Sequence, residues 1–178
     1  MQDSDEIFDV VNEADEIVGR ATRAEVHARK LRHRALHVFV FDANGRLFLQ
    51  ERSHNKDSFP GRLDSSASGH VHSGESYEAG AVRELSEELG LEILAEDLKR
   101  HFKIEACSET DWEFVWTYSL QTRAPLRLHP LEIESGAFYL PGQIRAMLAQ
   151  PPDKFAPSFR RVFQEFDRRK LWPRSGRH

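Results

Sequence analysis

Residues 69–91 read GHVHSGESYEAGAVRELSEELGL, and this stretch carries the strongest structural signal in the chain. Ser76 can accept a hydrogen bond at the start of a helix, and Gly90 can end that helix in a left-handed conformation. Apolar residues recur between them at helical spacing: Ala81, Val82, Leu85 and Leu89. The sequence therefore predicts a helix over residues 76–89 with one face packed on a sheet.

The same helix carries an acidic face. Glu84, Glu87 and Glu88 are related by i, i+3 and i+4, so their carboxylates share one side of the helix. Hard oxygen ligands of this kind suit Mg²⁺ or Mn²⁺, which also bind substrate phosphates. A solvated acidic face is the alternative, and the glycines and Arg83 at fixed spacing favour a metal site over it.

Three other residues of this stretch are expected to support the acidic face in different ways. Arg83 lies four residues before Glu87 and can orient its carboxylate. Glu75 lies at the helix start, where the helix dipole favours a carboxylate, and we assign it a structural role. Gly69 is expected to let the backbone turn into the loop before the helix, with its carbonyl free to bind a metal.

The rest of the chain alternates β-prone and helical segments. Strands are expected at 7–11, 16–18, 35–41, 46–50, 63–69, 101–104, 114–120 and 137–140, and further helices at 24–32, 142–149 and 157–169. Asp42-Ala-Asn-Gly45 indicates a hairpin, and residues 53–62 read as a polar loop. Strands mixed with a few helices predict an α/β (α+β) sandwich. One domain over 1–178 is expected, with an N-terminal strand extension at about 7–34 and a tail at 171–178.

Composition places the chain among soluble intracellular proteins. Its 178 residues are 30% charged with a net charge of −4, which gives no reason to expect binding to a nucleic-acid polymer. Cys107 is the only cysteine, so no intrachain disulfide can form, as expected in a reducing cytoplasm. No apolar run approaches the ~20 residues that cross a bilayer. A cytoplasmic location without membrane attachment is therefore expected.

The stretch 69–91 matches the pattern G-x5-E-x7-R-E-U-x-E-E-x-G-U, where U is apolar, at all nine specified positions. It resembles the signature of the Nudix hydrolases. That resemblance implies an α/β/α sandwich with a mixed central sheet and hydrolysis of diphosphate bonds. It makes Glu84, Glu87, Glu88 and the Gly69 carbonyl ligands of Mg²⁺ (or Mn²⁺), with Arg83 supporting the catalytic glutamates Glu87 and Glu88.

The motif does not identify a general base. Glu134, or its neighbour Glu132, precedes a strand-like segment where several Nudix hydrolases place a catalytic glutamate. Asp111 and Glu113 are the rival pair. We favour Glu134 at this point.

The flanking segments resemble the Nudix branch that includes type I isopentenyl diphosphate isomerase. They are DVVNEADEIVGRATR, LRHRALHVFVFD and LFLQERSHNKDSFPGRLDSSASGH. In that isomerase an arginine and a lysine before a Pro-Gly turn bind the substrate diphosphate, which implies the same role for Arg52 and Lys56. Its metal-binding histidines align with His37 and His70, whereas a third aligns with Lys30.

Two departures separate this chain from the isomerase. Ser68 stands where the isomerase has its catalytic cysteine, just before a Gly-His pair. The three glutamates are intact here, whereas the isomerase helix lacks the full set. Structural roles are expected for His37 and His70, since the third aligned position is Lys30 rather than histidine.

We therefore predict a metal-dependent Nudix hydrolase acting on a small-molecule diphosphate, first of all a nucleoside di- or triphosphate. The aromatics Trp112, Phe114 and Trp116 are expected near the specificity pocket, and a homodimer is allowed. The alternatives are isopentenyl diphosphate isomerase activity and a diphosphate-binding module without turnover.

Overall fold

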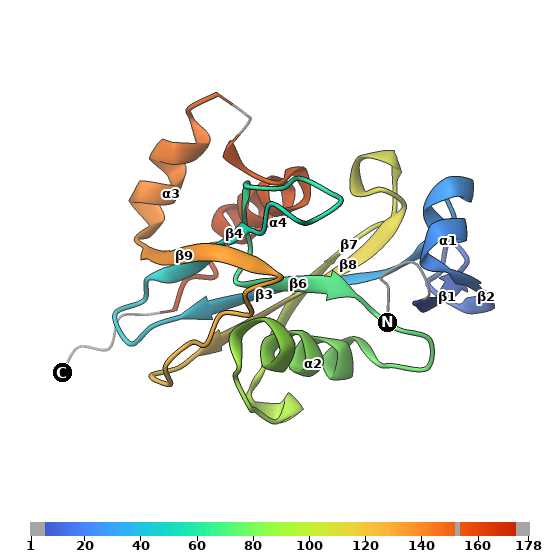
Figure 1. Cartoon of the computed structure of the whole chain (residues 1–178), viewed down its shortest axis with the longest axis horizontal. Coiled ribbons are helices and arrows are strands. Elements are labelled where there is room, and N and C mark those ends of the chain that lie inside the picture. The colour runs from blue at the N-terminus through green and yellow to red at the C-terminus, as the bar shows by residue number, and fades with distance from the viewer. Residues whose placement is uncertain (1–5, 152–153, 174–178) are drawn as a thin grey trace.

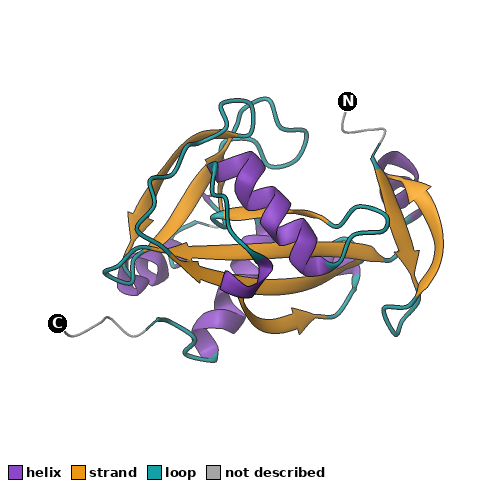
Figure 2. Cartoon of the chain, turned by 90° about the horizontal axis from the view of Figure 1, so that it is seen from below, coloured by secondary structure: helices purple, strands orange, loops and turns teal. Residues whose placement is uncertain are grey.

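The structure is a computed structural model that describes residues 6–151 and 154–173. Its first elements form a small N-terminal unit: strands β1 (Ile7–Val11) and β2 (Ile17–Thr22) pair antiparallel and precede helix α1 (Arg23–Arg29). Thr22 begins α1 with a capping box that uses Glu25. This two-stranded sheet stands apart from the main sheet (Figure 2). The expected N-terminal strands are confirmed, and the helix ends slightly earlier than predicted.

A mixed sheet forms the centre of the described chain. Only the central pair, β3 with β8, runs parallel, and the other pairs are antiparallel. The order is β5-β4-β3-β8-β7, with β6 added to β3 and β9 added to β4. The seven strands are β3 (His33–Phe41), β4 (Leu47–Arg52), β5 (Leu63–Asp64), β6 (Ala67–His70), β7 (Lys99–Ile104), β8 (Glu113–Gln121) and β9 (Ile133–Tyr139).

The predicted hairpin between β3 and β4 is confirmed at its turn, but the two strands do not pair along their length. The turn closes through the Asp42 N–H to the Arg46 carbonyl at 3.0 Å, but β3 and β4 pair only at Phe41 and Leu47. Beyond that point β6 pairs with β3, and β5 and β9 pair with β4. The single strand expected at 63–69 is therefore two short strands, β5 and β6, which fill the space where β3 and β4 diverge.

Helices cover both faces of the sheet (Figure 1). Alternation along β3 directs Ala35, Phe39 and Phe41 to one core and Leu36, Val38 and Val40 to the other. Helices α3 (Pro141–Leu148) and α4 (Pro157–Arg168) pack on the first core, and α2 (Tyr77–Leu89) packs on the second. This arrangement confirms the α/β/α sandwich with a mixed sheet.

The two ends of α2 are those that the sequence predicts. Ser76 caps the helix by accepting from the Ala79 N–H at 3.1 Å, and Gly90 ends it with φ of 62°. Ala81, Leu85 and Leu89 are fully buried against the sheet. This packing fixes the rotation of α2 and so determines where its glutamates point.

The described end of the chain also packs on the core. Leu171 and Trp172, which were expected in a tail, lie against the cluster that contains Phe41, Phe163 and Phe166. The Trp172 indole N–H donates to Asp167 at 2.8 Å. The rest of the predicted tail, residues 174–178, lies outside the described residues. In the described part of the chain, no helix has the length and apolar character to span a bilayer.

Candidate active site

A cavity of about 680 Å³ opens between α2, the loop after β4 and the N-terminal unit. It brings together the predicted metal ligands, the predicted phosphate-binding residues, and Glu132 and Asp111 of the four candidate bases, whereas Glu134 and Glu113 do not line it. The lining includes the α2 residues Arg83, Glu84, Glu87 and Glu88, Gly69 of β6, and the predicted phosphate-binding residues Arg52 and Lys56. Acidic and basic side chains thus meet across one cavity, as diphosphate binding with a cation requires.

Arg83 holds the acidic face together. Its guanidinium donates to Glu84 at 2.7 Å, to Glu87 at 3.2 Å and to Glu75 at 2.8 Å. It also donates to the His70 carbonyl at 2.9 Å, which ties α2 to β6. Arg83 therefore positions two of the three predicted ligands, and the pairing with Glu75 agrees with a structural role for that residue.

The three glutamates differ in burial. Glu84 and Glu88 are buried, with 9% and 5% of each residue exposed, whereas the Glu87 side chain is 58% exposed. Burial raises the pKa of Glu84 to about 7 and that of Glu88 well above its usual range. Glu88 accepts from the Gln50 amide at 2.9 Å and from the Ser68 N–H at 3.3 Å. Two carboxylates held close together in a low dielectric provide a strongly attractive site for a divalent cation.

Gly69 does not form the turn that the sequence predicted. It lies inside β6, opposite Leu36, and its φ is outside the left-handed range, so no turn requires a glycine here. A Cβ at this position would overlap the carboxylate of Glu84. The missing side chain therefore makes room for the buried glutamate.

The two predicted phosphate-binding residues also line the cavity. Arg52 donates to Asp64 at 3.1 Å and to the Ser58 carbonyl at 3.0 Å. Lys56 forms an ion pair with Glu132, which also lines the cavity.

Glu134 lies outside the cavity lining, on β9, with its side chain exposed to solvent. Glu134 lies at an irregularity of the β4–β9 register, between Ile133, which pairs with Arg52, and Ser135, which pairs with Glu51. Glu132 precedes β9, and its carbonyl accepts from the Ser53 N–H at 3.0 Å in the loop after β4. Of the two neighbouring candidates for the base, the structure brings only Glu132 to the glutamates of α2.

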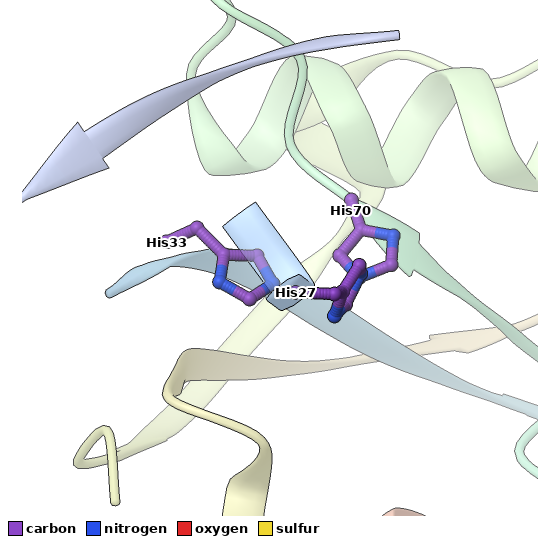
Figure 3. A group of neighbouring side chains, drawn as sticks. All are labelled: His27, His33 and His70. Atoms are coloured by element: carbon purple, nitrogen blue, oxygen red, sulfur yellow. The ribbon is translucent and has the colours of Figure 1, made fainter. Parts of the chain in front are cut away.

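A cluster of histidines lies on the other side of the cavity, and sequence reasoning missed most of it. Figure 3 shows the imidazoles of His27, His33 and His70 gathered together, from α1, β3 and β6. One ligand atom from each lies within 4.8 Å of the others. Glu113 joins them, 2.9 Å from the His70 Nε2 atom and 3.5 Å from the His33 Nε2 atom. Six of the nine histidines fall between residues 27 and 72. This concentration is the sequence feature that could have indicated the cluster.

The cluster presents unpaired ring nitrogens. The His27 Nδ1 atom donates to Asp111 at 2.8 Å, and the His33 Nδ1 atom donates to the Leu31 carbonyl at 2.9 Å. The Nε2 atom of His27 is buried without a hydrogen-bond partner, and the Nε2 atom of His33 has only the longer contact to Glu113. Neutral imidazoles oriented by such partners are typical ligands of Zn²⁺ and similar ions. This donor set could hold a second type of cation, softer than the one that suits the glutamates.

His37 and Lys30, which the isomerase alignment pointed to, do not join this cluster. His37 is buried, lines the cavity and bonds to the Ser65 hydroxyl at 2.6 Å, while burial lowers its pKa. Lys30 ends α1 in a left-handed conformation. The rivals Asp111 and Glu113 are occupied by the histidines, so neither is placed to act as a base beside α2.

The aromatic residues expected near the specificity pocket lie elsewhere. Phe114 is buried, Trp112 lies under Arg32, and Trp116 lies under Arg100. None of them lines the cavity in the described part of the chain. Among the lining residues, Phe59 in the loop after β4 is the one Phe, Tyr or Trp side chain.

Comparison with known proteins identifies the family of the chain. Residues 31–161 match the model of the NUDIX domain. A Nudix hydrolase of Deinococcus radiodurans is 36% identical over 146 residues, covering 82% of this chain and 85% of that relative. An uncharacterised Nudix hydrolase of Yersinia pestis is 35% identical over 156 residues, covering 85% of this chain and 80% of that relative.

The fold agrees as well. The crystal structure of DR0079 from Deinococcus radiodurans superimposes with a TM-score of 0.80 at 30% identity, covering 90% of this chain and 98% of that one. The matched region contains α2 and the whole cavity wall that its glutamates form.

Proposed function

Because this chain belongs to the Nudix family and is a Nudix pyrophosphohydrolase, we propose that it hydrolyses a phosphoanhydride bond of a nucleoside di- or triphosphate with Mg²⁺ or Mn²⁺. One observation carries the proposal. The glutamates of α2 and the cations Arg52 and Lys56 line the same cavity, so a single diphosphate can contact both.

The acidic face fits a hard divalent cation. Glu84, Glu87 and Glu88, with the Gly69 carbonyl beside them, would hold the ion, and Arg83 positions Glu84 and Glu87. When bound, such an ion neutralises phosphate charge and lowers the pKa of a bound water. Arg52 and Lys56 would bind the diphosphate: the Arg52 guanidinium suits two phosphate oxygens, and the Lys56 ammonium adds a mobile charge.

We assign the general base to Glu132 in place of Glu134. Its carboxylate lines the cavity and pairs with Lys56, whereas Glu134 is exposed outside it. A base must reach the water that it deprotonates, and of Glu132 and Glu134 only Glu132 lines the cavity. Glu132 would accept the proton as water attacks phosphorus, and the two phosphorylated products would then separate.

The character of the cavity supports a polar substrate. Apart from Ala24, Ala35, Leu36 and Phe59, its walls are glycine or polar and charged residues. A prenyl chain needs an apolar wall to leave water, whereas ribose and phosphate groups need hydrogen-bonding partners. Ser68 also lines the cavity where the isomerase would need its cysteine.

One observation favours the isomerase as the second candidate. The histidines of the cluster resemble, in kind, the metal ligands of that enzyme. Incubation with isopentenyl diphosphate and Mg²⁺, followed by detection of dimethylallyl diphosphate, would reverse the assignment.

A substrate panel tests the proposal. The protein is assayed with Mg²⁺ or Mn²⁺ against nucleoside di- and triphosphates, dinucleoside polyphosphates, sugar nucleotides, and prenyl and thiamine diphosphates. We expect metal-dependent release of nucleoside monophosphate from the nucleoside di- and triphosphates. Tight binding without turnover across the panel would identify a binding module instead. A cytoplasmic location and a homodimer stay predictions.

A further inference from the structure

Phe59 is an exposed aromatic side chain in the wall of a polar cavity. It is 44% exposed, and among the exposed large hydrophobic residues of the described chain it is the one with an aromatic ring and the one that lines the cavity. It belongs to none of the three hydrophobic clusters. Single exposed hydrophobic residues are ordinary on protein surfaces. This one, however, lies in the predicted active site, where packing in a core does not explain it.

The loop after β4 holds Phe59 in an unfavourable backbone conformation. Its φ is 51°, in the left-handed region that bulky residues rarely adopt. Strain of this kind persists where the surrounding contacts impose it, and it is concentrated at ligand sites. Here the Gly61 N–H donates to the Arg52 carbonyl at 2.9 Å, and the Arg52 N–H donates to the Arg62 carbonyl at 2.9 Å. These bonds close the loop and fix the backbone that carries the ring.

The same loop connects the ring to a predicted phosphate-binding residue. The Arg52 Nε–H donates at 3.0 Å to the Ser58 carbonyl, which belongs to the peptide bond between Ser58 and Phe59. The Arg62 guanidinium lies over the Phe59 ring, 5.8 Å from its centroid, and supports the ring by a cation–π contact. The Phe59 ring and the Arg52 guanidinium therefore line one cavity as parts of one hydrogen-bonded loop.

We propose that Phe59 stacks on the base of the substrate and is the residue that selects nucleotides among diphosphate compounds. The inference rests on the proposed function and adds to it a specificity-determining residue. Stacking on an aromatic ring accepts every base, because every base has a π face. Phe59 therefore favours nucleotides as a class rather than one base, while the neighbouring Arg52 binds the phosphate oxygens of the same molecule.

Two substitutions separate stacking from plain apolar contact. Phe59→Leu keeps an apolar side chain but removes the ring, whereas Phe59→Tyr keeps the ring. Both new residues have a Cβ and meet the same backbone restriction at a φ of 51°, so neither substitution relieves the strain. Leu94→Ala, which shortens an exposed apolar side chain outside the cavity lining, is the control.

Calorimetric titration with non-hydrolysable ligands in the presence of Mg²⁺ provides the first test. The α,β-methylene analogues of ADP and UDP carry a base, and methylenediphosphonate has the same P–C–P group without one. Phe59→Leu should bind both nucleotide analogues more weakly than the wild type, by roughly tenfold, and methylenediphosphonate equally well. Phe59→Tyr and Leu94→Ala should match the wild type for all three ligands. Unchanged affinity of Phe59→Leu for the nucleotide analogues would contradict the inference.

The second test detects the stack itself by proton magnetic resonance. The ring current of an aromatic side chain shifts the resonances of protons above its face upfield. The adenine H2 and H8 signals of the ADP analogue should therefore move upfield on binding to the wild type and to Phe59→Tyr, but not on binding to Phe59→Leu. An equal upfield shift with Phe59→Leu would show that the base lies on another group.

Turnover separates failure of this inference from failure of the proposed function. If the wild type hydrolyses nucleoside di- or triphosphates but Phe59→Leu keeps its affinity for the analogues, only this inference fails. If the wild type neither hydrolyses a nucleotide nor binds an analogue, both fail. If the analogues bind with the expected dependence on the ring but no nucleotide is hydrolysed, the role of Phe59 stands and the hydrolase function fails.

Discussion

Gly69→Ala tests the central geometric claim about the site. A methyl group at this position would overlap the Glu84 carboxylate, which is 9% exposed and held by Arg83 at 2.7 Å. The backbone of β6 accepts alanine, because the φ of Gly69 is outside the left-handed range. Any effect must therefore come from moving Glu84 rather than from backbone strain.

The size of the effect follows from overpacking. Forcing one carbon into a filled site costs about 1–3 kcal/mol, which lowers Tm by roughly 2–10 °C in a protein of this size. Displacing a metal ligand by an ångström should lower kcat by about 100-fold. Mn²⁺ affinity should fall in parallel.

Gly19→Ala is the matched control, because Gly19 is also in a strand and nothing lies within 4 Å of an added Cβ. Thermal unfolding, Mn²⁺ binding and turnover are compared for both variants. If Gly69→Ala behaves like Gly19→Ala in all three measurements, Glu84 does not need the space that Gly69 leaves, and the reasoning is wrong.

Further predictions concern single side chains. Glu88→Gln should lower turnover by about two orders of magnitude while leaving the fold intact, as circular dichroism would show. Glu132→Gln should lower kcat, whereas Glu134→Gln should leave it unchanged; equal effects would refute the choice of base. Burial lowers the pKa of His101 to about 4, so the unfolded chain binds a proton that the folded chain excludes between pH ~6.5 and 4. The free energy of unfolding should therefore fall as pH drops through that window, by roughly 1 kcal/mol after solvent screening. In His101→Gln, the free energy of unfolding measured with urea should lack this pH dependence. Co²⁺ titrated into the wild type should develop visible absorption from nitrogen ligation, and His33→Phe should abolish it; an unchanged spectrum would exclude the histidine cluster as a site.

Local signals explain what was predictable in the fold. The helix α2, its cap at Ser76 and its end at Gly90 all depend on residues within a few positions of one another. The strands were recognisable for the same reason. Their pairing was not, because β6 and β9 fill edges of β3 and β4 that a simple hairpin would have used.

The candidate base shows where sequence reasoning fails in the site. Glu132 and Glu134 are two residues apart at the start of β9 and are chemically identical. Their different surroundings come from the irregular β4–β9 register at Glu134 and from the bond of the Glu132 backbone to Ser53 in the loop after β4. No local pattern distinguishes the two.

The sequence by itself determined the family, the acidic face of α2 and the pairing of Arg83 with it, because helical spacing places those groups together in any fold that contains the helix. Only the tertiary structure decided which carboxylates are buried, why Gly69 has no side chain, and that Lys56 lies against Glu132. It also assembled His27, His33, His70 and Glu113 from four elements spread over 87 positions, 27–113. These contacts are long-range, so they exist only once the sheet order and the docking of the N-terminal unit are set.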